Sequence, residues 1–400
     1  MAAPIPIEQA FAHILAQSGL AAIERVGLRE ALGHYLAEDI RADRDWPPFN
    51  RSSVDGFAVF SPDTRSAPDV LEVIEEVAAG TAPTRALAPG QAIKIMTGAP
   101  VPAGADCVIM QEQTAIPKPG FVRFMNTMRS GQNIARRGED AKTGEIVIQS
   151  GTYIGPAEVG VLAAVGCHAV PVRRKPGIAI LGSGDEVVEP DAIPGAAQIR
   201  NSNSYQLLAQ CAAHQLDARY LGIARDDREA TRKLIEEGLS NAGVLISTGG
   251  VSVGDHDHVG AVLNEQGVEI FFNRVAIKPG KPTTFGRRGE TLVFGLPGNP
   301  VAALVCFHLL AMTAIRVRMG ARDPLPRWIP LPVDGCVKGA ADRTTFLPCK
   351  LAVKDGRTMV RILEWHGSGH IAALVNADGL FVQKPNETIE DGQTVTYYPF

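Results

Sequence analysis

The chain has 400 residues, of which 45% are hydrophobic and 20% are charged, and its formal net charge is −4. This length exceeds what one hydrophobic core supports and predicts about two to four domains. The balanced charge argues against nucleic-acid binding and against attachment to an anionic membrane. The six cysteines contain no Cys-x-x-Cys pair and residues 1–20 lack a secretory signal, so we expect a cytoplasmic protein.

The first part of the chain changes from a helical to a strand-like pattern. A helix over residues 6–20 would carry on one face Ile7, Ala10, Phe11, Ile14 and Leu15. Strand-like runs such as 56–60, 92–96 and 107–110 then alternate with Pro and Gly turns, and a second helix follows at 156–165. Pairing of the two helices would make the β-rich stretch an insertion. We therefore predict a discontinuous N-terminal domain (1–40 plus 141–172) and a β-rich inserted domain (41–140).

From residue 177 onward, strands alternate with helices of about ten to fifteen residues, which indicates βαβ units and a mainly parallel sheet. The predicted strands are 178–181, 218–221, 244–246, 275–277 and 292–294. Asn201–Ser204 and Asp226–Asp227 supply N-caps for two of the helices. Asn299 and Pro300 begin a third helix, which ends near residue 319. Its apolar run, 301–315, is shorter than the ~18 residues of a membrane span and predicts a core helix. This α/β domain is predicted to cover 173–322.

A proline-rich stretch at 323–330 opens the last segment. Strands predicted at 328–331, 347–353, 359–363 and 394–398 indicate a small β domain over 323–400. Pro330 has no N–H for a sheet, so it predicts that the first of these strands is an edge strand.

Three glycine-containing loops, each after a predicted strand, lie close together in the sequence. They are 247–257 (Ser-Thr-Gly-Gly-Val-Ser-Val-Gly-Asp-His-Asp), 278–282 (Lys-Pro-Gly-Lys-Pro) and 296–300 (Leu-Pro-Gly-Asn-Pro). Glycines free backbone N–H groups to face an anion, and Lys278 and Lys281 add positive charge. Asp255 and Asp257 would repel a phosphate unless a metal ion came with it. The combination predicts a phosphorylated ligand bound together with a metal ion.

Each of these features also has a purely structural explanation. The first loop could be a glycine turn with Asp255 as a helix cap. The loop at 278–282, called the lysine loop below, could be a solvated surface turn. Asp185 and Glu186, which follow the first strand of the α/β domain, suit either a capping role or that of metal ligand or general base. Asp226 presents the same alternatives. The arginines and acids of residues 131–140 could simply pair with one another.

Taken together, a series of motifs resembles the molybdopterin molybdenumtransferase family, often called MoeA and related to the E domain of gephyrin. The motifs occupy residues 53–57, 96–104, 131–133, 138–140, 183–186, 249–257, 278–282 and 296–301. The resemblance implies a homodimer of four-domain subunits. Each would have a three-layer α/β/α domain of the molybdopterin-binding type and a C-terminal β-barrel. It also implies a reaction, in which adenylylated molybdopterin and molybdate give molybdenum cofactor and AMP with the help of Mg²⁺. A molybdopterin adenylyltransferase would be a partner.

The resemblance further implies roles for individual residues. The expected catalytic residues are Asp55, Thr97, Asp140, Glu186, Asp226 and Asp257, with Glu186 and Asp257 as metal ligands. The expected substrate-binding residues are Ser183, Gly249, Gly250, Ser252, Gly254, Arg274, Lys278, Lys281, Pro297, Gly298, Asn299 and Pro300, with Arg343 and Ser368 for molybdate. Asp55, Thr97 and Asp140 would approach the α/β domain of the other subunit, so the active site would be shared.

Two departures and two alternatives accompany this interpretation. Ala302 stands where many relatives carry serine, and Arg274 where lysine is frequent. A molybdopterin adenylyltransferase is one alternative, but the segments flanking 177–320 and the loop Gly-Gly-Val-Ser-Val-Gly argue against it, because that enzyme type usually carries Gly-Gly-Thr-Gly. A non-catalytic scaffold is the other, and the intact carboxylates and lysines argue for retained catalysis.

Overall fold

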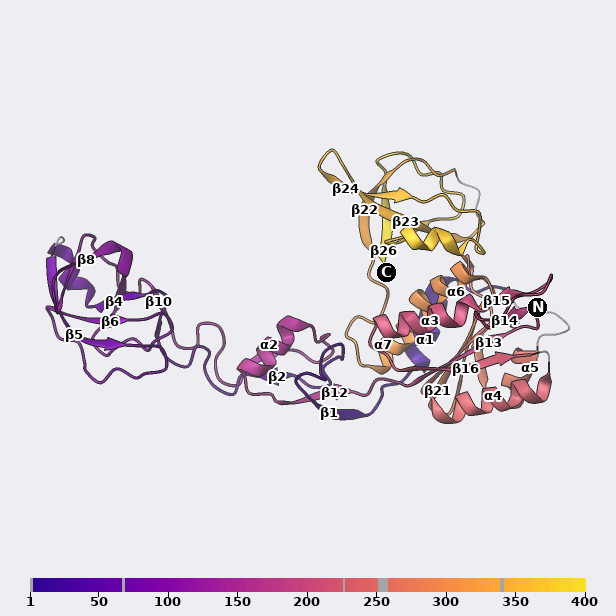
Figure 1. Cartoon of the computed structure of the whole chain (residues 1–400), viewed down its shortest axis with the longest axis horizontal. Helices are drawn as coiled ribbons and strands as arrows, with labels where there is room; N and C mark the ends of the chain where they lie inside the picture. The colour runs from indigo at the N-terminus through magenta and orange to yellow at the C-terminus, as the bar shows by residue number, and fades with distance from the viewer. Residues whose placement is uncertain (1–2, 67–68, 226, 251–257, 339–341) are drawn as a thin grey trace. The chain divides into compact units, whose positions relative to one another are not determined.

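Contacts within the chain divide it into two units (Figure 1). The structure is a computed structural model, and it describes residues 3–66, 69–225, 227–250, 258–338 and 342–400. Unit 1 comprises residues 1–38, 150–156 and 169–400, and unit 2 comprises 39–149 and 157–168. The four domains predicted from the sequence, with their boundaries near residues 40, 140, 172 and 322, stay a prediction.

Unit 2 is built around a six-stranded mixed sheet in the order β7-β4-β6-β5-β9-β8. The strands are β4 (Gly56–Val59), β5 (Asp69–Val77), β6 (Gln91–Ile95), β7 (Cys107–Met110), β8 (Thr114–Lys118) and β9 (Phe121–Phe124). Two short pairs and a helix accompany it: β2 (Ile40–Arg41) with β11 (Ile146–Ile148), β3 (Arg51–Ser52) with β10 (Ile134–Ala135), and α2 (Pro156–Ala164). Phe57 and Ile109 are buried in its core, as the apolar runs predict, and Phe124 is buried with them.

The central element of unit 1 is a six-stranded sheet in the order β16-β13-β17-β21-β20-β18. Its strands are β13 (Ile178–Ser183), β16 (Ala218–Ala224), β17 (Val244–Thr248), β18 (Glu269–Phe272), β20 (Thr284–Arg288) and β21 (Thr291–Leu296). Neighbours from β16 to β21 pair in parallel, and β20 is antiparallel to both β21 and β18. The mainly parallel sheet is confirmed, although β18 and β20 were not predicted.

Helices cover both faces of this sheet and give three layers (Figure 1). Ile178, Ile180 and Ile246 face one layer, whereas Ala179, Leu181 and Leu245 face the other, because side chains alternate along a strand. The first layer contains α1 (Ile7–Gln17), α3 (Ser202–Ala213), α6 (Pro300–Cys306) and α7 (Met312–Arg318); the second contains α4 (Arg228–Asn241) and α5 (His258–Glu265). The predicted N-caps Asn201 and Asp227 accept backbone N–H groups of their helices.

The N-terminal helix corrects one sequence prediction. α1 buries Ile7, Ala10 and Ile14 in the α/β core and packs on α7, whereas Leu15 is 41% exposed. Its expected partner α2 lies in unit 2 except for Pro156, so the predicted pairing of these two helices is wrong. The first 38 residues, α1 included, instead belong to unit 1. Unit 1 also contains the antiparallel pair of β1 (Ile23–Gly27) and β12 (Ala169–Arg173).

The third predicted helix is a core helix. α6, a π-helical turn η3 (Phe307–Ala311) and α7 together form a helix from Pro300 to Arg318. By length and composition it could cross a membrane, but 83% of its most apolar window is buried inside the protein. Burial against the sheet therefore explains its apolar character, as the sequence predicts.

The C-terminal strands form a closed five-stranded barrel. Its members are β22 (Ile329–Asp334), β23 (Thr344–Lys354), β24 (Arg357–Ile362), β25 (Gly379–Gln383) and β26 (Thr394–Pro399), and β23 pairs with β25 to close the ring. The prediction of β22 as an edge strand is wrong, since it pairs with both β26 and β24. Pro330 is tolerated because the pairing with β24 begins only at Val333.

The apolar run 275–277 lies outside the α/β sheet. Ile277–Lys278 forms a two-residue strand, β19, parallel to β23 of the barrel. The prediction that this run is a strand of the α/β sheet is therefore wrong. As a consequence, the lysine loop begins where the barrel meets the α/β domain.

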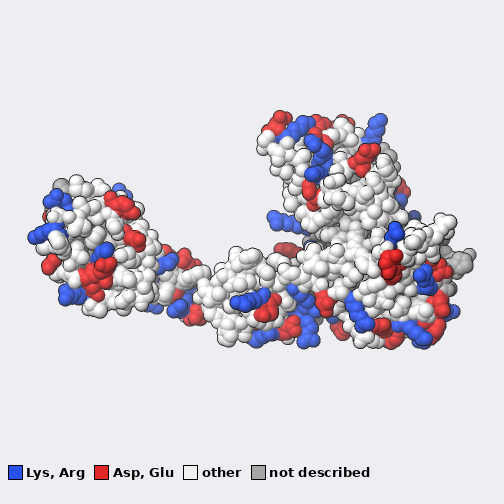
Figure 2. Space-filling view, viewed as in Figure 1, with Lys and Arg blue, Asp and Glu red and all other residues white. Residues whose placement is uncertain are grey.

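The face shown in Figure 2 carries basic and acidic side chains interspersed over both units. This agrees with a chain that has 39 basic and 43 acidic residues.

Unit 1 also contains a short parallel strand pair, β14 (Val187–Val188) with β15 (Ile199–Arg200), which precedes α3.

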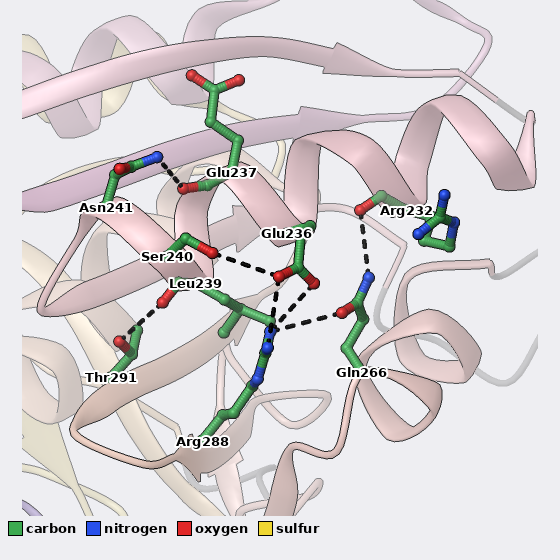
Figure 3. Close-up of polar contacts among 9 residues, drawn as sticks. All are labelled: Arg232, Glu236, Glu237, Leu239, Ser240, Asn241, Gln266, Arg288 and Thr291. Carbon is green, nitrogen blue, oxygen red and sulfur yellow. Dashed lines mark hydrogen bonds and ion pairs between the residues drawn. The ribbon is translucent and has the colours of Figure 1, made fainter.

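Polar contacts fix α4 against the sheet (Figure 3). The Thr291 hydroxyl lies 3.1 Å from the Leu239 carbonyl and 2.8 Å from the Ala242 carbonyl at the end of α4. Arg288 pairs with Glu236 of α4 at 3.2 Å. These contacts tie α4 to the end of β20 and the start of β21.

Replacing Thr291 with valine is expected to lower the free energy of unfolding by about 1–2 kcal/mol, because the two carbonyls lose a buried donor. Urea denaturation measures the change. Ser240→Ala is the matched control, since this exposed hydroxyl is 3.3 Å from Glu236 and its loss should stay within about 0.5 kcal/mol. Equal losses in the two variants would contradict the assigned role of Thr291.

Candidate functional site

Three segments of unit 1 meet at the carboxyl edge of the parallel strands. The register places Gly182 of β13 beside Thr248 of β17, and Thr248 beside Leu296 of β21. The segments that follow these residues therefore leave the sheet side by side. The Gly249 N–H donates to the Leu296 carbonyl at 3.1 Å, which joins the segment after β17 to the end of β21. Such an edge is where open α/β sheets bind ligands.

Gly249 and Gly250 let the backbone approach Ser183 closely. Both have a positive φ, +80° and +62°. A Cβ on Gly249 would lie 2.6 Å from the Ser183 carbonyl oxygen, and one on Gly250 would lie 2.7 Å from the Ser183 hydroxyl. Neither position accepts a side chain without movement. The structure thus brings together the predicted residues Ser183, Gly249 and Gly250.

Glu186 lies at the same edge, just after β13. Its carboxylate folds back over Gly184, where an added Cβ would lie 2.4 Å from one of its oxygens. The side chain is exposed and forms no hydrogen bond with the described residues. An exposed carboxylate with free oxygens fits a ligand of a hard divalent cation. Within the described ranges no three His, Cys, Asp or Glu side chains form a metal cluster, so Glu186 would need a further ligand from elsewhere.

Loop 296–300 is held from two sides. The Asn203 amide donates to the Gly298 carbonyl at 2.8 Å, and Asn203 is 7% exposed. Asn299 and Pro300 occupy the N-cap and first position of α6, as predicted. The Asn299 side chain does not cap the helix but donates to the Ser368 hydroxyl at 2.9 Å, and the Val301 N–H donates to the Ser368 carbonyl at 3.1 Å. The predicted residues Pro297, Gly298, Asn299, Pro300 and Ser368 are therefore brought together.

Sequence reasoning missed three residues around this loop. Asn203 was grouped with a helix cap, and only the fold brings its amide to Gly298. His366 and His370 flank Ser368 with their rings stacked 4.9 Å apart, and the His366 N–H lies 3.3 Å from the His370 Nδ1. Their His-x-x-x-His spacing was the signal that could have singled them out.

The lysine loop is anchored between the barrel and α6. Lys278 is exposed, and Arg343 lies 3.5 Å from the carbonyl of Ile277 directly before it. The Arg343 guanidinium lowers the pKa of Asp342, and Lys278 contributes in the same direction. On the other side Gly280 is buried, and its carbonyl accepts the Thr283 hydroxyl at 2.6 Å. Thr283 in turn lies 3.0 Å from the Cys306 Sγ of α6. Arginine and lysine are thus gathered where the two domains of unit 1 meet.

The remaining members of this group are the half-buried residues Arg274 and Lys281. The Val275 N–H donates to the Lys281 carbonyl at 2.9 Å, and the Ile5 N–H donates to the Arg274 carbonyl at 3.0 Å. Backbone bonds therefore hold the two ends of the lysine loop near each other. The lysine loop is not one of the three segments at the strand ends, because β19 belongs to the barrel sheet.

In unit 2 a separate group surrounds Asp55. The Thr97 N–H donates to the Asp55 carboxylate at 2.7 Å and the Thr97 hydroxyl donates at 2.8 Å. The backbone bond first, and then the hydroxyl bond, lower the pKa of Asp55. The Asp55 side chain is exposed and ionised at neutral pH. The structure thus pairs two of the predicted catalytic residues.

Asp140, the third predicted residue of unit 2, lies on a loop held by Asp45. The Asp140 N–H donates to the Trp46 carbonyl at 2.9 Å. Asp45 accepts the Thr143 N–H at 3.0 Å and the Arg137 Nε–H at 2.6 Å, and these bonds lower the pKa of Asp45 to about 2. The loop is therefore fixed on both sides of Asp140, whose side chain is exposed. Asp226, Ser252, Gly254 and Asp257 lie outside the described residues.

Family models match nearly the whole chain. Residues 5–166 match the MoeA N-terminal region (domain I and II), residues 179–317 match the probable molybdopterin binding domain, and residues 332–400 match the MoeA C-terminal region (domain IV). The three matches follow one another in the order of the chain.

Curated relatives and solved structures agree with these models. The chain is 38% identical over 401 residues to a molybdopterin molybdenumtransferase of Bacillus subtilis (strain 168), covering 98% of this chain and 93% of the relative. It is 32% identical over 379 residues to one of Staphylococcus aureus (strain Mu50 / ATCC 700699), covering 94% and 90%. A crystal structure of the molybdopterin biosynthesis moeA protein from Pyrococcus horikoshii OT3 is 29% identical with a TM-score of 0.82, covering 100% of both chains.

Proposed function

Because the chain belongs to the MoeA family of molybdopterin molybdenumtransferases, we propose that it inserts molybdate into adenylylated molybdopterin, forming molybdenum cofactor and releasing AMP. The observation that carries this function is the strand edge, where Gly249 and Gly250 lie against Ser183 beside the exposed carboxylate of Glu186. Backbone N–H groups in such a turn suit phosphate oxygens. The adenylyltransferase alternative is not favoured, since the chain also matches the MoeA N-terminal and C-terminal regions.

Phosphate binding falls to the glycine loop and the lysine loop. Ser183, Gly250, Ser252 and Gly254 would orient the pyrophosphate link with backbone and hydroxyl donors. Gly249, whose N–H is bonded to the Leu296 carbonyl, would let the loop lie close to Ser183. Lys278, Lys281 and Arg274 would neutralise the charge that remains on the phosphates. Loop 297–300, fixed by Asn203 and Ser368, would present its backbone to the same ligand. These donors hold the anhydride in place for hydrolysis.

The carboxylates would hold Mg²⁺ and orient water. Glu186 and Asp257 are the proposed ligands, and Asp226 is proposed as a further catalytic residue. When bound, Mg²⁺ neutralises phosphate oxygens and so favours cleavage of the anhydride. The fit of Glu186 rests on its exposed, unpaired oxygens among the described residues. The protein's own contribution is to hold the phosphates and the water in line.

Arg343 and Ser368 would bind molybdate. The Ser368 hydroxyl accepts a hydrogen bond from Asn299 and can donate its own proton to an oxyanion. Arg343 lies beside Lys278 at the junction of the barrel and the α/β domain, which would bring two cations to a dianion. Both residues belong to unit 1.

The active form would be a cytoplasmic homodimer. Asp55, Thr97 and Asp140 of one subunit would complete the site on the α/β domain of the partner, where the ionised Asp55 held by Thr97 would contact the substrate. A molybdopterin adenylyltransferase would supply the adenylylated substrate.

AMP release tests this function. The purified protein, incubated with adenylylated molybdopterin, molybdate and Mg²⁺, is expected to liberate AMP, and the Asp257→Ala variant is expected to lose most of this activity. Chromatography quantifies AMP, and transfer of the product to a cofactor-free molybdoenzyme verifies insertion. Absence of AMP from the wild type, or unchanged turnover in Asp257→Ala, would overturn the proposed mechanism.

A further inference from the structure

A hollow of about 340 Å³ lies in unit 1 near the end of α7. Its lining includes two arginines, Arg173 and Arg322, and two leucines, Leu20 and Leu36. Its volume is near the lower end of the range typical of small-molecule sites. It lies away from the strand-end edge: the helix from Pro300 to Arg318 has 19 residues and therefore extends about 28 Å from that edge to the hollow.

The two arginines are anchored but carry no counter-charge. Arg173 donates to the Ala21 carbonyl at 2.8 Å, and Arg322 donates to the Ser150 carbonyl at 3.0 Å. Among the described residues neither forms an ion pair, whereas Arg174 pairs with Glu24 at 3.0 Å. A guanidinium has five donors, so most of the donors of both groups stay available. Two fixed cations at one hollow favour an anion.

The backbone around the arginines is closely fitted. Gly151 and Gly320 have φ values of +75° and +76°. A Cβ on Gly151 would lie 2.9 Å from the backbone nitrogen of Arg322, and one on Gly320 would lie 3.0 Å from the Arg173 Cγ. The Arg322 N–H also donates to the Gly151 carbonyl at 3.0 Å. Gly151 thus lets the Arg322 backbone approach closely, and Gly320 lets the Arg173 side chain lie against the backbone, which limits the freedom of that side chain before any ligand arrives.

We propose that this hollow is a second ligand site, separate from the strand-end edge, that binds a small organic phosphate monoester. Arg173 and Arg322 hold the phosphoryl oxygens, because guanidinium and phosphate match in geometry and charge. The organic group lies against Leu20, which is 58% exposed. An inorganic oxyanion would carry the charge but would leave the apolar wall uncovered.

Isothermal titration with phenyl phosphate tests the site in the full-length protein. Saturable binding is expected in the wild type and in the Lys278→Gln/Lys281→Gln variant, whose changes lie at the proposed catalytic site. Binding is expected to weaken at least about tenfold in Arg322→Gln, and more in Arg173→Gln/Arg322→Gln, since each loses charge-assisted bonds. Arg174→Gln, in which a neighbouring paired arginine is changed, is expected to bind like the wild type.

Two further measurements compare the affinities of different anions and check that the Arg322→Gln variant is folded. Inorganic phosphate and molybdate are expected to bind at least about tenfold more weakly than phenyl phosphate, because they bury no apolar surface. Thermal unfolding of Arg322→Gln, which changes an exposed side chain, checks that its fold is retained. The proposal is overturned if the wild type shows no saturable binding, if Arg322→Gln binds normally, if Arg174→Gln loses binding equally, or if the inorganic anions bind as tightly as the ester.

Discussion

Replacing Gly249 with valine is expected to reduce AMP release at least about 100-fold, comparable to the loss of one preorganised oxyanion donor. Gly249 has a φ of +80°, which a β-branched residue avoids, and a Cβ there would lie 2.6 Å from the Ser183 carbonyl oxygen. The loop would have to move away from the edge, and its N–H groups would lose their alignment on the phosphates. Steady-state AMP release measures the effect.

Gly289→Ala is the matched control for this variant. Gly289 also has a positive φ, +56°, but an added Cβ would meet no atom within 4 Å. The control therefore carries the backbone strain without the collision, and its activity should stay near that of the wild type. Gly249→Ala provides a milder form of the same collision if the valine variant unfolds. Near-normal turnover in a folded Gly249→Val protein would show that the loop does not hold the substrate.

Replacing Glu186 with glutamine is expected to lower turnover about 100-fold and to raise the Mg²⁺ concentration needed for half-maximal rate. The amide keeps the size of the side chain but removes the charge that makes it a ligand of a hard cation. Because the carboxylate is exposed and makes no hydrogen bond within the described residues, the fold should be unaffected. AMP release over a range of Mg²⁺ concentrations separates loss of metal affinity from loss of maximal rate.

Asp191→Asn, a change to an exposed acid in the segment after β14, is the control for this loss of charge. It should leave both the rate and the Mg²⁺ dependence unchanged. If Glu186→Gln behaved in the same way, the carboxylate would have no part in the reaction. If it lowered the rate at every Mg²⁺ concentration by the same factor, Glu186 would act on substrate or water instead of the metal.

Much of the strand-end edge could be predicted from local patterns. The apolar runs at β13, β17 and β21 are each followed by Gly or Pro, and helix caps follow at Asn201, Asp227 and Asn299. In a parallel sheet the carboxyl ends of such strands share one edge, so Ser183, Gly249 and Gly298 could be placed together without a structure. The family resemblance named Asp55 and Thr97 as catalytic residues, and only the structure pairs them with each other.

Other features could not be predicted because they depend on partners far away in the sequence. Residues 275–277 look like any other short apolar strand, yet Ile277 pairs with Thr344 of the barrel. β20 carries too few apolar residues to be recognised, whereas β18 is mostly apolar but only four residues long. β20 pairs with the edge of β21, and β18 pairs in turn with β20. Pro330 lies in a strand with two neighbours, since one of them joins only from Val333 onward.

The sequence by itself determined the four parallel strands of the α/β sheet, the caps, the glycine and lysine loops and the α/β and β character of the parts, because these depend on residue type and short-range spacing. Only the tertiary structure decided that Asn203 and Ser368 form hydrogen bonds with loop 297–300. It also decided that the lysine loop starts at the barrel and that Arg173 and Arg322 line one hollow. Each of these contacts joins residues distant in the chain, and its existence depends on how the layers pack. Periodicity reports which side of an element is buried, but it does not report what the element packs against.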